Sequence, residues 1–93
     1  MPRYESSLGH KLDLYTLRNV ISSRYQHRTL KGCLRVYING YRKNFNFNLH
    51  ENGKIIFDAD SLVKAKTRIY KIIDWLKEQQ IIILVDEPGV REL

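Results

Sequence analysis

The sequence predicts a small α+β domain in which an antiparallel three-stranded meander packs against two helices, with a C-terminal strand. Two stretches with helical spacing of apolar residues, and a strong hairpin signal between them, predict this arrangement. The chain has 93 residues and a mass of 11.1 kDa, which suits one hydrophobic core. We therefore expect a single domain over residues 1–93, with the element order α-β-β-β-α-β.

The first helix is predicted over residues 12–25. Its apolar side chains recur at spacings of three and four residues, which places them on one helical face: Leu14, Leu17, Ile21 and Tyr25. Asp13 suits the start of this helix, because its carboxylate can accept hydrogen bonds from the first free backbone N–H groups. The helical period is lost over 27–32, so we expect the helix to end near Gln26.

A β-hairpin is predicted around Asn39-Gly40. An Asn-Gly pair between two alternating stretches is a strong hairpin signal, because both loop residues take positive φ. With these two residues as the loop, the expected cross-strand pairs are Ile38 with Tyr41, Val36 with Lys43 and Leu34 with Phe45. This face continues in Phe47 and Leu49, and we expect it to form the core.

The opposite face of the hairpin is predicted to be polar and free of acidic residues. It contains a cysteine, two arginines, a tyrosine and three asparagines: Cys33, Arg35, Arg42, Tyr37, Asn44, Asn46 and Asn48. Asparagine is depleted in strands. Three asparagines at alternate positions therefore indicate a role other than sheet stability.

A third strand and a second helix follow the hairpin. The strand is predicted over residues 54–57, after a turn at Asn52-Gly53. Residues that favour a helix start come next: Asp58, Asp60 and Ser61. An apolar stripe then extends the helix to about Gln79; its members are Leu62, Ala65, Ile69, Ile72, Ile73 and Leu76.

Two interpretations stay open for Trp75, which lies at the border of the helical stripe. Its side chain either fills the gap against the last strand or is exposed as an anchor for a partner. That strand is predicted over residues 81–85, from Ile81 to Val85, because this run is apolar and mostly β-branched.

The net charge of +6 is unevenly distributed along the chain. Residues 1–48 contain nine basic and two acidic side chains, whereas residues 49–93 contain seven basic and eight acidic ones. Between Asp13 and Glu51 there are seven lysines and arginines and no carboxylate. Clustered cations favour a polyanionic partner, because they release counterions from phosphates.

No enzymatic motif or metal-binding spacing occurs in the sequence. It lacks a glycine-rich phosphate loop, His-Glu-x-x-His and Gly-x-Ser-x-Gly, and its histidines are scattered over expected loops: His10, His27 and His50. Cys33 is the single cysteine. Arg35 on the same face favours mild activation of its thiol, but a lone cysteine in a small protein is usually an ordinary small side chain, and nucleophilic catalysis needs a base that the sequence does not offer. We therefore expect a non-enzymatic protein with no cofactor and no metal.

A cytoplasmic protein is expected. The longest apolar run has five residues, far below the ~20 needed to cross a bilayer, and the first residues lack the apolar segment of a signal peptide. A single cysteine cannot form an internal disulfide and agrees with a reducing compartment. We expect no membrane partner.

These features predict a small basic nucleic-acid-binding or regulatory protein, and its small size favours a phage or mobile-element origin and a place in the host cytoplasm. Arginine reads guanine and asparagine reads adenine in the major groove, which a β-ribbon can enter. The expected contact residues are Arg18, Arg24, Arg28, Lys31, Arg35, Tyr37, Arg42, Lys43, Asn44 and Asn46. The choice between DNA and RNA, and between single and double strands, stays open.

The element order helix, three strands, helix resembles the double-stranded-RNA-binding domain over about two-thirds of the chain. This resemblance implies RNA contacts through the first helix, Asn39-Gly40 and Lys64-Ala65-Lys66. Where that family places lysines, this chain has Asp58-Ala59-Asp60-Ser61. The three-stranded sheet followed by a helix is also similar to the arm-site-binding domains of phage integrases. This second resemblance implies major-groove contacts from the sheet face, through Arg35, Tyr37, Arg42 and Asn44.

The alternative function is a phage-type inhibitor, such as an anti-CRISPR or other counter-defence protein, that binds a host protein or ribonucleoprotein complex. A basic surface can dock on an acidic protein face, and arginine and tyrosine suit such interfaces. The apolar strand predicted over 81–85 can add to a partner's sheet edge or form a homodimer.

Overall fold

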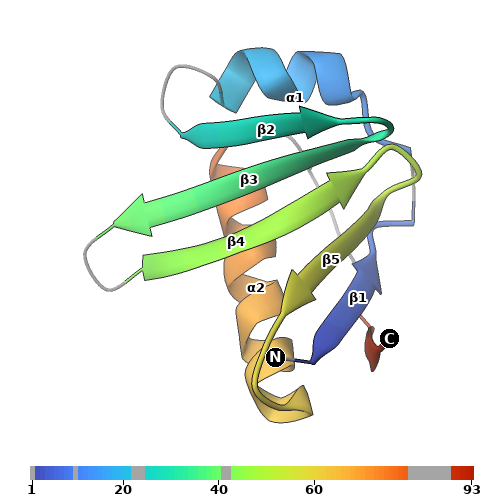
Figure 1. Cartoon of the computed structure of the whole chain (residues 1–93), viewed down its shortest axis with the longest axis vertical. Coiled ribbons are helices and arrows are strands. Elements are labelled where there is room, and N and C mark those ends of the chain that lie inside the picture. Colours follow the sequence, from blue (N-terminus) through green and yellow to red (C-terminus); the bar gives the residue numbers. More distant parts are fainter. Residues whose placement is uncertain (1, 10, 22–24, 41–42, 80–88) are drawn as a thin grey trace.

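One antiparallel sheet of six strands forms the framework of the protein, and both helices pack their apolar sides into a shared core (Figure 1). The computed structural model describes residues 2–9, 11–21, 25–40, 43–79 and 89–93. Its elements are β1 (Arg3–Ser7), α1 (Leu14–Ile21), β2 (Gln26–Leu30), β3 (Cys33–Gly40), β4 (Lys43–His50), β5 (Lys54–Asp58), α2 (Leu62–Glu78) and β6 (Val90–Glu92). The strand order is β2-β3-β4-β5-β1-β6, and the predicted α+β class is confirmed.

The predicted meander is present as β3, β4 and β5, and α2 coincides with the predicted second helix. Three described strands were not predicted: β1, β2 and β6. β1 lies between β5 and β6, so its partners are distant in the sequence. β2 is an edge strand whose residues are mostly exposed, and it therefore has no apolar alternation that a sequence pattern could reveal.

The first helix is shorter than predicted. It ends at Ile21, and Gln26 begins β2 instead of ending the helix. The strand predicted over 81–85 lies outside the described residues. The last described strand is β6, which pairs with β1.

The register of the β3–β4 hairpin differs from the prediction. Gly40 pairs with Lys43, and Ile38 pairs with Phe45 instead of Tyr41. The position of the loop was therefore wrong by two residues, and residues 41–42 lie outside the described part of the chain. The observed register places apolar residues opposite one another, whereas the predicted one opposed Val36 to Lys43. An even shift keeps each side chain on its face, so the predicted core face is still correct.

Side-chain caps fix the start of each helix. The Oγ atom of Ser61 accepts a hydrogen bond from the backbone N–H of Lys64 at 3.3 Å. Asp13 Oδ1 accepts from the backbone N–H groups of Tyr15 and Thr16, and Asp13 Oδ2 accepts from the Thr16 hydroxyl at 2.8 Å. Both predicted helix starts are confirmed.

The core lies between the sheet and the helices. Aromatic rings join the two layers, because Trp75 of α2 contacts Phe47 of β4 and Tyr25 edge to face, with ring centroids 5.6 and 5.0 Å apart. Trp75 is 7% exposed. It is therefore an interior residue and not an exposed anchor. The strand predicted over 81–85, against which the first interpretation packs it, lies outside the described residues. Among the described residues, no helix is long and apolar enough to cross a membrane.

Replacing Leu49 with alanine is expected to lower the free energy of unfolding by about 2–5 kcal/mol, because its fully buried side chain leaves a cavity. Val63→Ala is the matched control, since Val63 is 76% exposed on α2, and it should change stability by less than about 0.5 kcal/mol. Urea unfolding measures both values. Equal losses in the two variants would contradict this placement of the core.

Replacing Asp13 with alanine is expected to destabilise the protein at neutral pH and to have a smaller effect in acid. Hydrogen bonds from the Thr16 side chain and backbone hold the pKa of Asp13 below its ordinary value of 3.8. Because the pKa is lower in the folded state, this group stabilises the fold above the unfolded pKa, and the contribution is lost as the pH falls through the folded value. Urea unfolding of both proteins at neutral pH and at about pH 3 tests this; a difference that does not shrink in acid would be inconsistent with the cap.

Candidate nucleic-acid interface

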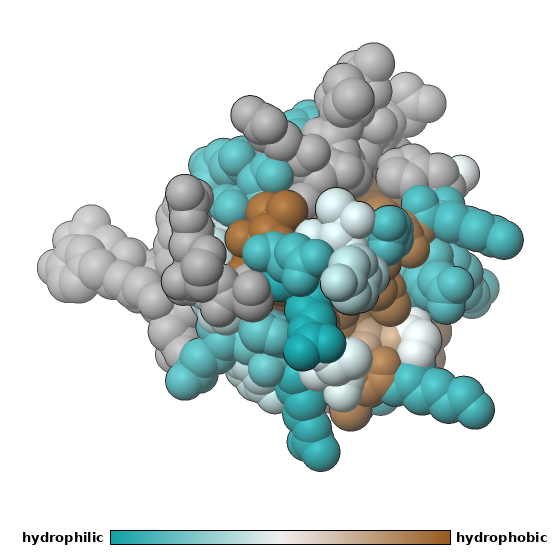
Figure 2. Space-filling view, turned by 90° about the horizontal axis from the view of Figure 1, so that it is seen from above, coloured by the Kyte–Doolittle hydropathy of each residue, from teal (hydrophilic) through white to brown (hydrophobic). Residues whose placement is uncertain are grey.

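One face of the sheet carries no described helix. In Figure 1, α2 runs behind the sheet and α1 lies along β2, while the front of the sheet faces the viewer. Residues that alternate with the core positions point to this side. We call it the open face. Figure 2 is turned by 90° and therefore does not look onto this face; it shows the molecule from above, with hydrophilic side chains extending from the rim around a few hydrophobic ones.

The part of the open face formed by β2, β3 and β4 contains cations and no carboxylate. Arg28 of β2 stands directly opposite Arg35 of β3. The two-residue turn between these strands adds the exposed Lys31, and Gly32 beside it has a φ of 65°, a conformation that favours glycine. Polar residues continue the surface onto β4, where Asn48 pairs with Arg35. We call Arg28, Lys31 and Arg35 the basic patch.

Arg35 is held from two sides. Its Nη2 donates a hydrogen bond to Asn46 Oδ1 at 3.1 Å, and its guanidinium carbon lies 5.5 Å from the centroid of the Tyr37 ring. The stacked ring and the amide restrict the guanidinium to one orientation, so its remaining N–H donors are preorganised. One face of the Tyr37 ring is therefore occupied by Arg35.

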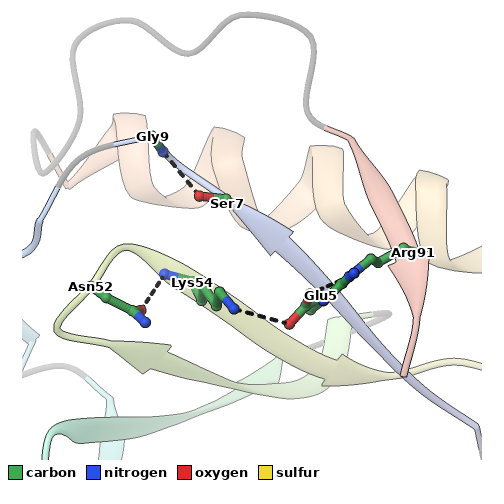
Figure 3. Close-up of polar contacts among 6 residues, drawn as sticks. All are labelled: Glu5, Ser7, Gly9, Asn52, Lys54 and Arg91. Atoms are coloured by element: carbon green, nitrogen blue, oxygen red, sulfur yellow. Dashed lines mark hydrogen bonds and ion pairs between the residues drawn. The ribbon is translucent and has the colours of Figure 1, made fainter.

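Carboxylates occur only at the other end of the described open face, on β1 and β5, and each has a cationic partner. Glu5 of β1 pairs with Arg91 and with Lys54, and Asp58 of β5 pairs with Arg3 at 3.8 Å (Figure 3 shows the Glu5 pairs). The described part of the open face is thus divided: the cations of β2 and β3 have no carboxylate beside them, whereas each carboxylate on β1 and β5 has a cationic partner.

The structure brings together five of the ten predicted contact residues: Arg28, Lys31, Arg35, Tyr37 and Asn46. Arg18 is exposed on α1 and is not part of the open face. Arg24 and Arg42 lie outside the described residues. Lys43 and Asn44 are placed by their backbone in β4, opposite Gly40 and Asn39.

Sequence reasoning missed the charged residues of the other end, namely Arg3, Glu5, Lys54, Asp58 and Arg91. Glu5 and Arg91 are 86 positions apart in the chain. Their pairing depends on a strand that was not predicted, and a single sequence contains no local pattern that joins positions so far apart.

Cys33 lies at the start of β3 and is buried. Burial raises the pKa of its thiol, and the neighbouring Arg35 opposes this shift without cancelling it. Of the two interpretations of Cys33, this favours an ordinary small side chain over an activated thiol. No group of three or more histidine, cysteine or carboxylate residues able to hold a metal occurs within the described parts of the chain.

Cys33 is expected to react slowly with a thiol reagent while the protein is folded, because its thiolate is disfavoured by burial. Denaturation in urea should restore the rate of a free cysteine. Absorbance of a released aromatic thiolate at neutral pH measures both rates. Rapid labelling of the folded protein would contradict the buried position.

Comparison with protein-family models, with curated proteins and with solved structures finds no match to this chain. The function of this chain is therefore inferred from the geometry and the charges of the open face.

Proposed function

We propose that this protein is a non-enzymatic nucleic-acid-binding module that contacts its ligand through the open face of β2, β3 and β4. One observation carries the proposal: Arg28 and Arg35 stand directly opposite each other on neighbouring strands with no carboxylate on that part of the face. Like charges in this position destabilise a sheet. A polyanion relieves the repulsion and releases counterions when it binds.

The residues of this face divide into two roles. Arg28 and Lys31 are exposed at the edge of the sheet, which suits contacts to phosphate. Arg35 has a fixed orientation and free donors, which suits a guanine edge or a bidentate phosphate contact. The Oδ1 atom of Asn48, opposite Arg35, is buried and has no hydrogen-bond partner among the described residues.

The size of the surface fits a nucleic acid. Neighbouring strands lie about 4.8 Å apart, so β2, β3 and β4 span roughly 10 Å between the outer two. The major groove of B-form DNA is about 12 Å wide and admits a β-ribbon. A single strand can instead lie across the face with its phosphates on the basic patch.

A second candidate is a protein-binding inhibitor. Val63 and Tyr70 of α2 are 76% and 47% exposed. They are seven positions apart, so they lie on the same side of the helix. Exposed aromatic and aliphatic side chains of this kind favour a protein partner. Binding through α2 does not use the basic patch, which separates the two candidates.

Fluorescence anisotropy with labelled single- and double-stranded DNA and RNA, at about 50 to 200 mM salt, tests the main proposal. The variant Arg28→Ala with Arg35→Ala is expected to bind about tenfold or more weakly. The slope of log affinity against log salt should also decrease by about two, because two phosphate contacts are lost.

The matched control is Lys66→Ala with Lys77→Ala, which removes the same charge from exposed positions on α2. It should retain the affinity and salt slope of the unchanged protein. Equal weakening in both double variants would show that net charge alone drives binding and would overturn the proposed interface. If the anisotropy does not change with any of the four polymers, the nucleic-acid-binding proposal is wrong and the protein-binding candidate is favoured.

A further inference from the structure

A cavity of about 320 Å³ lies at the other end of the open face, where the start of β6 meets β1 and β5. The lining residues with charged or hydroxyl side chains come from three strands: Glu5, Ser6 and Ser7 of β1, Lys54 of β5 and Arg91 of β6. Ser7 stands opposite Lys54, and Glu5 stands opposite Arg91. These four positions share one side of the sheet, as Figure 3 shows.

The charges at this cavity do not balance. Glu5 is 9% exposed, and Arg91 Nε donates a hydrogen bond to its Oε1 atom. Lys54 Nζ lies 3.8 Å from Oε2 of Glu5, which is an ion pair without a hydrogen bond. One carboxylate therefore faces two cations. Counted over the described residues that line the cavity, one positive charge is in excess.

Several hydrogen-bond donors there also have no partner among the described residues. Arg91 uses its Nε on Glu5, which leaves the donors of its two terminal nitrogens. Lys54 retains its three ammonium N–H groups, and the Ser7 hydroxyl accepts from the Gly9 N–H at 3.2 Å, which leaves its own hydrogen to donate (Figure 3). Donors from three strands suit a tetrahedral oxyanion with several free oxygens better than a planar carboxylate.

We propose that this cavity binds the phosphate group of a phosphate monoester. Lys54, Ser7 and Arg91 donate to its oxygens, and Glu5 is a positioning residue that holds the two cations at the cavity. A phosphate monoester occurs in small phosphorylated metabolites and at the phosphorylated end of a nucleic acid, and both present the same group. The inference rests on this cavity and not on the basic patch.

Lys54→Met is the primary test, with Lys64→Met as its matched control. Lys64 also pairs with one carboxylate, Asp60 at 3.2 Å, but it is on α2 and outside the cavity. Titration with inorganic phosphate at constant ionic strength, followed by amide chemical shifts, should give saturable changes centred on Ser7, Lys54 and Arg91. The dissociation constant is expected to increase about tenfold in Lys54→Met, through loss of a charge-assisted hydrogen bond, and to stay unchanged in Lys64→Met.

A second variant, Ser7→Ala, removes a donor without changing charge and should also weaken phosphate binding. The double variant Arg28→Ala with Arg35→Ala should still bind phosphate. A negative result for nucleic-acid binding at the basic patch can therefore be distinguished from a negative result for phosphate binding at the cavity. Shifts that spread over all basic residues without saturation, or equal affinities in Lys54→Met and Lys64→Met, would overturn the proposal.

Two further ligands identify the source of the phosphate. A nucleoside 5′-monophosphate and a short oligonucleotide with a 5′-phosphate are each compared with the same molecule lacking the phosphate. Binding of both phosphorylated molecules at Ser7 and Lys54 supports a general monoester site, and binding of the mononucleotide alone supports a metabolite. Equal binding with and without phosphate would contradict the inference.

Discussion

Phe47 of β4 and Trp75 of α2 meet edge to face with their ring centroids 5.6 Å apart, and this contact joins the sheet to the longer helix. Trp75 also touches Tyr25, so the same indole connects α2 to the chain beside β2. Edge-to-face aromatic pairs add to the stability gained from burial alone. Because α2 covers one side of the sheet in this way, the other side is left as a surface of alternating polar residues.

The two ends of the open face differ in how their charged side chains are neighboured. On β1 and β5 the described carboxylates of this face, Glu5 and Asp58, each have a cation beside them, and Glu5 is buried enough that its pairing matters. On β2 and β3 the cations Arg28 and Arg35 stand opposite each other without an acid. A sheet selected only for stability has no reason to keep that second arrangement. This contrast within one surface is the physical argument for a ligand at the basic patch.

The fixed orientation of Arg35 also has an energetic consequence. A free arginine loses side-chain entropy when it binds, whereas the Tyr37 ring and Asn46 already restrict this one. Part of the side-chain entropy of Arg35 is therefore already lost when the protein folds, so less is lost when a ligand binds. Removing Tyr37 would act on affinity through Arg35 as well as through any contact of its own.

Local features of the sequence were sufficient for α2, for the caps at Asp13 and Ser61, and for the core face of the β3–β4 hairpin. Each depends on spacings within about ten residues, where the apolar period and the capping chemistry are visible. Three of the ten predicted contact residues, Arg35, Tyr37 and Asn46, also share one side of the sheet, because alternation along β3 and β4 decides it. Arg28 joins them only through β2, a strand that the sequence pattern did not predict. The position of the hairpin loop could not be decided in this way, since an even shift of register leaves the alternation unchanged.

The position of β1, the pairing of Glu5 with Arg91 and the cavity beside them follow from packing between distant segments. These features join the two ends of the chain, and no local period connects residues that are 86 positions apart. The apolar faces and the concentration of cations, in contrast, are visible in the amino-acid sequence, because side-chain chemistry and short-range periodicity fix both. The fold determined which of those cations have acidic neighbours, because strand order in a sheet is set by packing between distant segments.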